Sequence, residues 1–285
     1  MERRCTLFRL AGLLLALAGA GPACAGAEGD WRALPTGHLF APYAADPHRV
    51  TFAVAQQRIA ESDIPGAGTN RLSLRTGARL PLARFEPADA AGTRWQVGLP
   101  VGFDGVFDHS NNEDNIGWDG NYGLLVTASP DPALAFKGGL LHTSSHVGDE
   151  YIERTGRKRI DYTREEWLLA VSWRPLRRWR TYLEGAWAYG LNNTELQEEG
   201  RAQAGVEFER PHLFGAGVDG YAAVDLAAWA ERDWRVDTTV QAGAAMRADG
   251  RRWRIGLEYH DGRPPLGEFF QATERYTALV LSLDV

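Results

Sequence analysis

The chain has 285 residues, two cysteines and a formal net charge of −6 at neutral pH. An acidic chain is a poor candidate for binding nucleic acid, so we predict no such partner. No stretch beyond residue 27 approaches 18 consecutive apolar residues, which excludes a helical membrane protein.

The first 27 residues read as a cleaved signal peptide. Arg3, Arg4 and Arg9 precede an apolar run over 10–20, and small residues follow at 23–27. Lipoprotein processing at Cys24 is the alternative, but no bulky aliphatic residue precedes that cysteine. We therefore predict complete removal, which leaves a mature chain without cysteine, hence without a disulfide or a cysteine metal site.

Residues 28–49 are predicted to form an N-terminal periplasmic segment outside the regular fold. Pro35, Pro42 and Pro47 resist the pairing of a β-sheet. The segment is expected to be either a tethered periplasmic stretch or a small plug.

Residues 50–285 alternate apolar and polar side chains in short stretches, as at 95–104. Such a period of two, repeated over about ten residues at a time, is typical of a transmembrane β-barrel. The fold class is therefore all-β, an up-and-down antiparallel transmembrane barrel of about 12 strands. The expected strands are 50–60, 70–85, 93–107, 118–129, 132–146, 162–174, 178–191, 198–209, 217–230, 234–247, 251–260 and 272–285.

The connections alternate between tight and long. Turn chemistry marks 129–132, 174–177 and 248–250, whereas the polar segments 104–120, 146–161 and 261–271 are longer. Outer-membrane barrels place their short turns in the periplasm, so we predict localisation in the cell outer membrane with that orientation.

Aromatic residues support the membrane interpretation over a soluble barrel or sandwich. Trp167 and Trp173 bracket one strand, and Trp253 and Tyr259 another, in the register of the apolar residues. The expected partners are outer-membrane lipids and lipopolysaccharide. The final strand resembles the terminal signal used in barrel assembly, with Val285 in place of an aromatic, so the assembly machinery is a further expected partner.

The densest polar cluster spans residues 142–151. Leu140 and Phe136 share the even register, so a regular strand puts His142 and Ser144 on the lipid-facing side, two residues apart. A serine hydroxyl needs a neighbouring base to become a nucleophile, and the base needs an acceptor that fixes its tautomer. This pair resembles the His-x-Ser pair of outer-membrane phospholipase A and lipid A deacylase.

That resemblance implies catalytic roles for His142, Ser144 and a third residue that orients the histidine. At the spacing of that third residue this chain has Gly156, so we assign the role to Asp161, with Glu165 and the loop carboxylates as alternatives. The competing interpretation is a binding or loop-ordering cluster at the rim, formed by His146, Asp149 and Glu150 together with His142 and Ser144.

No metal or other cofactor is predicted. His146, Asp149 and Glu150 are plausible ligand types, but their spacing predicts no cage. The polar loop 108–115 lacks the glycine and the terminal glutamate of a calcium loop.

The lumen offers another function, a narrow channel. Twelve strands enclose a lumen that side chains can fill. Charges expected in it are Arg75, Arg79, Lys137, Arg235 and Arg254, which would line a pore, and Glu184, Glu207, Asp225, Asp237 and Glu258, which would close it by pairing with them.

Four motifs make the chain similar to an uncharacterised bacterial family, a domain of unknown function predicted to lie in the outer membrane. They are LPTGHLFAP at 34–42, ADP at 45–47, SSHVGDEY at 144–151 and DGRPPLGEFF at 261–270. The resemblance implies location and architecture but no reaction. We therefore expect an outer-membrane barrel of unknown activity, either a structural or binding barrel or a narrow channel. The alternative is a lipid acyl-ester hydrolase, and whether the chain is an enzyme stays open.

Overall fold

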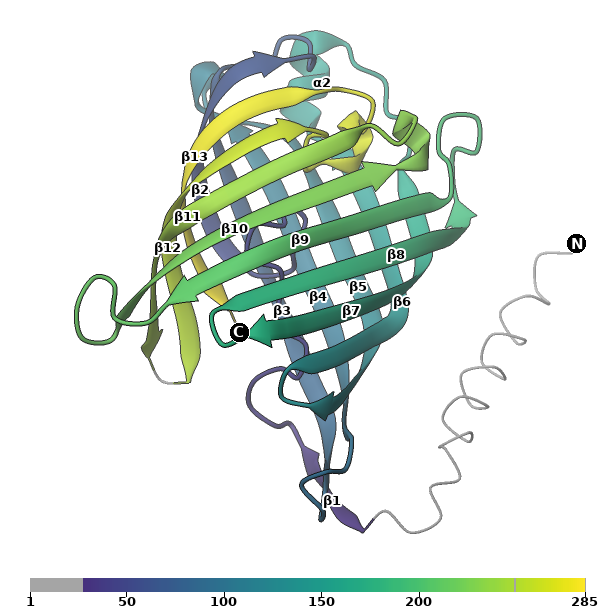
Figure 1. Cartoon of the computed structure of the whole chain (residues 1–285). Helices are drawn as coiled ribbons and strands as arrows, with labels where there is room; N and C mark the ends of the chain where they lie inside the picture. The colour runs from purple at the N-terminus through teal and green to yellow at the C-terminus, as the bar shows by residue number, and fades with distance from the viewer. Residues whose placement is uncertain (1–27, 249, 285) are drawn as a thin grey trace, which may run out of the picture.

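The computed structural model describes residues 28–248 and 250–284, and the predicted signal peptide lies outside them. Strands β2 to β13 form a closed antiparallel barrel, because each strand pairs with its neighbours in the chain and β13 also pairs with β2 (Figure 1). The prediction of a 12-stranded all-β barrel is confirmed. One further strand, β1, pairs with β3.

The barrel strands agree with the expected segments to within a few residues at each end. Their bounds are β2 Phe52–Ser62, β3 Asn70–Pro87, β4 Arg94–Asp108, β5 Asp114–Asp131, β6 Leu134–Val147, β7 Thr163–Leu176, β8 Trp179–Leu191, β9 Gly200–Arg210, β10 Val218–Trp229, β11 Val236–Ala248, β12 Arg251–Gly262 and β13 Glu274–Asp284. Loops at one rim, called here the long-loop rim, hold helix α2 (Asp149–Thr155) and the 3-10 turns η1 (His109–Asn111), η2 (Ala230–Arg232) and η3 (Gly267–Phe269). The opposite rim is called the short-turn rim.

Alternation along each strand separates two surfaces. In β7, Trp167, Leu169 and Trp173 are exposed, while Arg164 and Glu166 are buried. Charged residues inside and large apolar residues outside are the reverse of a soluble protein and the pattern of a membrane barrel. Among the described residues, none of the helices combines the length and the hydropathy that a bilayer-spanning helix needs.

Residues 40–49 run inside the barrel and are called here the plug (Figure 1). Arg180 of β8 donates a hydrogen bond to the carbonyl oxygen of Pro42 at 2.9 Å. The amide of Ala44 donates to Glu207 of β9 at 2.7 Å. Of the two forms predicted for the N-terminal segment, residues 40–49 have the contacts of a plug, because their backbone groups bond the inner side of the barrel wall.

Side chains of the plug also contact the barrel wall. Tyr43 stacks on Tyr182 with ring centroids 3.8 Å apart, and its hydroxyl donates to Glu184 at 2.9 Å. Arg49 donates to Ser282 of β13 at 2.8 Å. The plug therefore contacts strands on two sides of the barrel.

An apolar cluster covers the long-loop end of the lumen. Tyr151 of α2 and Phe269 of η3 are buried against Ile64, Ile116 and Leu266. The sequence pattern predicted a loop over 146–161 and no helix there, so α2 is an addition. Its single buried residue, Tyr151, provides too little periodicity to reveal a seven-residue helix.

Strand β1, Gly29–Ala33, was not expected. It pairs antiparallel with Ala83–Pro87 at the end of β3, and both extend beyond the barrel at the short-turn rim (Figure 1). The prolines that argue against pairing begin at Pro35, after this strand has ended.

Candidate functional site

A row of three side chains crosses the outward face near the long-loop rim. The strand register places Tyr122 of β5, His142 of β6 and Glu165 of β7 next to one another. The imidazole of His142 stacks on the Tyr122 ring with centroids 4.4 Å apart, and its Nδ1 lies 3.5 Å from Glu165 Oε1. The histidine is thus held on one side by a ring and on the other by a carboxylate.

The strand is regular here, so the outward direction of His142 follows from the pleat. Phe136, Leu140 and His142 share the even register, and Leu140 pairs with exposed Trp167. The side chain of His142 is only 19% exposed, and its Nδ1 is buried without a hydrogen bond. A buried imidazole nitrogen facing a carboxylate favours the tautomer with the proton on Nδ1.

Ser144 lies two residues further along the same face. It pairs with Gly120 of β5 and Thr163 of β7, one row closer to the rim than His142. A Cβ placed on Gly120 would lie 3.4 Å from Ser144 Oγ, so the hydroxyl leans towards that glycine. Among the described residues no hydrogen bond joins Ser144 to His142. The structure therefore brings the two residues together on one face, with the hydroxyl and imidazole not yet bonded.

Asp161, the residue assigned from sequence to orient the histidine, lies elsewhere. It is exposed in the loop before β7 with a left-handed φ of 56°. It is four residues from Glu165, a span of about 13 Å along an extended chain. The register brings Glu165, and not Asp161, opposite His142.

The three residues assigned to binding share one pocket. His146, Asp149 and Glu150 line an open cavity of about 330 Å³ together with Trp118 and Arg159. The His146 ring stacks on Trp118 at 4.1 Å, and Arg159 pairs with Asp149 at 2.6 Å. This pocket is adjacent to Ser144 along the strand. In the described part of the chain no group of three or more His, Cys, Asp or Glu side chains could hold a metal ion.

Ser145, the inward neighbour of Ser144, belongs to a different network. Its hydroxyl donates to Asp119 and accepts the amide of Glu268 at 2.8 Å. Asp119 also accepts the amide of Gly267 at 3.0 Å. These bonds tie η3 to β6 directly behind the Ser144 position, and loop-to-strand contacts over such a distance in sequence leave no local sequence pattern.

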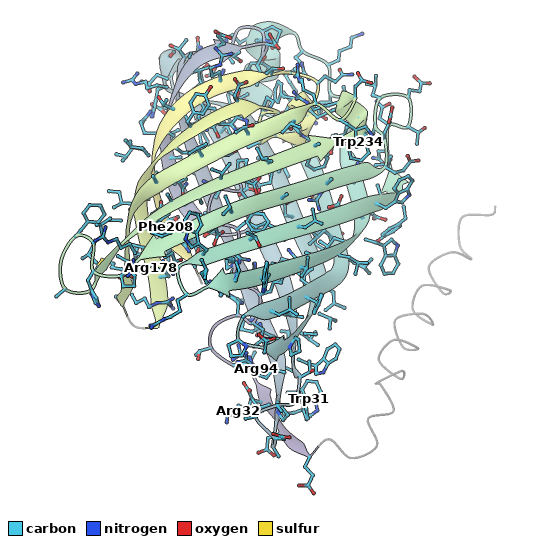
Figure 2. The ribbon with its side chains drawn as sticks, in the orientation of Figure 1. Trp31, Arg32, Arg94, Arg178, Phe208 and Trp234 are labelled. Carbon is cyan, nitrogen blue, oxygen red and sulfur yellow. The ribbon has the colours of Figure 1, made fainter. Side chains whose placement is uncertain are left out.

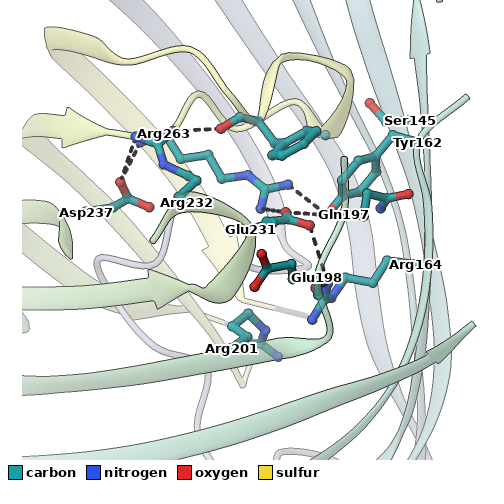
Figure 3. A network of polar contacts seen from close by, with 12 residues as sticks. Ser145, Tyr162, Arg164, Gln197, Glu198, Arg201, Glu231, Arg232, Asp237 and Arg263 are labelled. Carbon is teal, nitrogen blue, oxygen red and sulfur yellow. Dashed lines mark hydrogen bonds and ion pairs between the residues drawn. The ribbon is translucent and has the colours of Figure 1, made fainter. Parts of the chain in front are cut away.

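A second buried network joins three loops under the long-loop rim (Figure 3). Arg263 pairs with Glu231 at 2.7 Å and donates to the Tyr162 hydroxyl at 2.9 Å. Burial raises the pKa of Tyr162 to about 12. Burial alone would lower the pKa of Arg263, but Tyr162 and Glu231 raise it above its usual value. The arginine therefore stays charged.

The lumen around the plug is filled by paired charges. Lys137 lies 2.7 Å from Glu184, which also pairs with Arg201 at 2.8 Å. The cavity that remains has a volume of about 140 Å³. Internal pairing, the alternative to a charge-lined pore, accounts for Lys137 and Glu184. Arg75 instead donates to the plug carbonyl of Pro47, and Arg235, which was expected in the lumen, is exposed at the long-loop rim.

Comparisons with known proteins give a family and a fold. The family model described as "Protein of unknown function (DUF1207)" matches residues 27–284. No curated protein matches the chain.

The solved structures that resemble the chain are outer-membrane barrels. Outer membrane phospholipase A from Escherichia coli has a TM-score of 0.55 at 10% identity, covering 82% of this chain and 92% of that one. The Salmonella typhi outer membrane phospholipase dimer with bound calcium has a TM-score of 0.55 at 11% identity, covering 86% and 95%. LpxR from Salmonella typhimurium has a TM-score of 0.41 at 12% identity, covering 82% and 100%. At such identities the likeness establishes the fold alone.

Proposed function

We propose that this chain, which belongs to the family of proteins of unknown function DUF1207, is an outer-membrane hydrolase of lipid acyl esters. Its nucleophile is Ser144, its base is His142, and Glu165 takes the orienting role assigned from sequence to Asp161. The observation that carries the proposal is the His142–Glu165 contact on the outward face, one row from Ser144.

The proposed mechanism is acyl transfer through a nucleophile, a general base and a residue that orients the base. Glu165 holds the Nδ1 proton, which leaves Nε2 to accept the proton of the Ser144 hydroxyl as Oγ attacks the ester carbonyl. The acyl group passes to Ser144, and the alcohol leaves with the proton carried by His142. Water then releases the fatty acid by the same steps. Hydroxyl–imidazole bonds in free enzymes are often long, so the absence of that bond here is compatible with the role.

The position of the site supports a lipid as substrate. A polar histidine on the outward face of a barrel is costly unless it has a partner or a purpose. Below it, Leu140 and Trp167 continue an apolar surface along which acyl chains can lie. Two of the structures that share this fold are named phospholipases.

The test is release of fatty acid from a phospholipid and from lipid A by the purified mature chain folded in detergent. Ser144→Ala and His142→Ala are expected to remove activity, and Glu165→Gln to lower kcat by roughly 10⁴-fold, as loss of an orienting carboxylate does. Thr163→Ala removes a hydroxyl directly opposite Ser144 and should leave the rate unchanged.

Asp161→Asn is the matched control for Glu165→Gln. Equal losses from both carboxylate variants would contradict the assignment of Glu165. Activity that survives in Ser144→Ala, with the barrel folded as judged by heat-modifiable migration, would rule out the proposed site.

A non-enzymatic barrel is the second candidate, and the plug favours a closed form of it over a channel. The plug and the Lys137–Glu184–Arg201 pairs occupy the lumen. The full mature chain in planar bilayers should show no stepwise conductance at moderate voltage. Regular openings would restore the channel hypothesis.

A further inference from the structure

Exposed arginines gather at three neighbouring hairpin ends of the short-turn rim, where β7 joins β8, β9 joins β10 and β11 joins β12. Five of them are called here the arginine arc, namely Arg177, Arg178, Arg210, Arg247 and Arg251. These turns follow one another around the barrel because strands β7 to β12 pair in chain order. The five arginines therefore lie along one part of this rim.

The arginines of the arc outnumber the acidic residues of the same hairpin ends, which are Glu209, Asp219 and Asp249. None of its five guanidinium groups forms an ion pair with a carboxylate in the described residues. The nearby pair joins Arg252 to Glu209 at 2.8 Å and uses an arginine outside the arc. The opposite rim differs, because its loops hold twelve acidic and seven basic residues. Those loops are 63–69, 109–113, 148–162, 192–199, 230–235 and 263–273.

Large apolar side chains adjoin the arc on the outward face of the barrel. Trp173, Trp179 and Trp253 are 54%, 42% and 37% exposed. Trp179 contacts Phe208 with ring centroids 4.8 Å apart, and Figure 2 shows Phe208 beside Arg178 at this end of the barrel. Tryptophan at the edge of an apolar band marks the level of the lipid head groups. The arginines lie at or just beyond that level.

We propose that the arginine arc binds the phosphate groups of anionic phospholipids, such as phosphatidylglycerol, in the leaflet at the short-turn rim. A guanidinium group forms paired hydrogen bonds to phosphate and is weakly hydrated, so it suits this contact better than lysine. The tryptophan rings fix the depth of the barrel in the bilayer, and the arginines attract the negatively charged lipid head groups. The surface lies at the rim opposite Ser144 and is independent of the proposed hydrolase.

The test compares phosphatidylglycerol with phosphatidylcholine of the same acyl chains. The mature chain in neutral detergent is titrated with each lipid at low salt, and bound lipid is counted by native mass spectrometry. Phosphatidylglycerol should bind more tightly. The double variant Arg177→Ser/Arg178→Ser should weaken that binding roughly tenfold or more, since each arginine near a charged surface contributes roughly fivefold.

A matched control removes the same charge from the other end. Arg58 and Lys158 are exposed towards the long-loop rim, and Arg58→Ser/Lys158→Ser should leave phosphatidylglycerol binding unchanged. All variants must first show the same heat-modifiable migration as the native barrel. Equal affinity for the two lipids, equal losses in both double variants, or full competition by millimolar inorganic phosphate would each overturn the proposal.

Discussion

The buried carboxylate of Glu184 offers the sharpest test of how the lumen is held together. Its side chain is 4% exposed and contacts three partners: Lys137 Nζ at 2.7 Å, Arg201 Nη1 at 2.8 Å and the Tyr43 hydroxyl at 2.9 Å. Glu184→Gln keeps an acceptor for Tyr43 but removes the charge. Breaking a buried ion pair by removing one partner costs about 3–5 kcal/mol.

The lower end of that range applies, because Arg201 retains a second carboxylate, Glu166, at 2.5 Å. Lys137 alone is left without a counter-charge, and the expected loss in free energy of unfolding is about 3 kcal/mol. Adding Lys137→Met to Glu184→Gln removes the orphaned charge and should recover at least half of that loss.

The measurement is urea unfolding in small lipid vesicles, followed by tryptophan fluorescence. Glu209→Gln is the control, because its pair with Arg252 is partly exposed and should cost no more than about 1 kcal/mol. A loss below about 1 kcal/mol for Glu184→Gln would refute the reasoning, as would a double variant no more stable than the single one. Either result would mean that water screens the lumen.

Two further changes test packing and pH. In Gly139→Ala the new Cβ would lie 2.1 Å from a backbone oxygen of β5, so we expect a loss of about 1–3 kcal/mol in urea unfolding. In Gly138→Ala the nearest atom is a Leu169 side-chain carbon at 3.0 Å and the nearest backbone oxygen lies at 3.5 Å, so that variant should cost less, and equal losses would contradict this. Burial, together with Arg263 and His260, holds the pKa of His48 well below its usual value, so the unfolded chain binds that proton first and stability falls as pH drops below about 6.5. His48→Gln should reduce the loss of stability between about pH 7 and about pH 5, and an unchanged pH dependence would count against the neutral histidine.

The barrel was predictable because its pattern is local. Neighbouring residues of a strand point to opposite faces, so a short stretch of sequence is enough to assign both faces. The same alternation placed His142 and Ser144 on the outward face. The residue that orients His142 could not be identified from alternation alone, because Asp161 and Glu165 lie in the same register of the strand. Only the pairing of β6 with β7 selects Glu165, and register between strands separated by a 15-residue loop depends on how that loop folds.

Other features depend on contacts between distant parts of the chain. The plug bonds to β8, β9 and β13, over separations of up to 233 residues. Prolines indicate that the segment resists pairing, but they do not say which wall receives it. The Ser145–Asp119 contact is similarly invisible, because a buried serine and an aspartate on adjacent strands have no distinctive spacing.

The contact of Arg49 with Ser282 has a consequence for the order of assembly. The plug precedes β2 in the chain, yet this partner lies in β13, the strand whose pairing with β2 closes the wall. A segment threaded after closure would have to pass a lumen already filled with paired side chains. We therefore expect the plug to be enclosed while β13 pairs with β2, so that docking of the plug and closure of the barrel form one cooperative step. Contacts this remote in sequence are expected to make such a step slow.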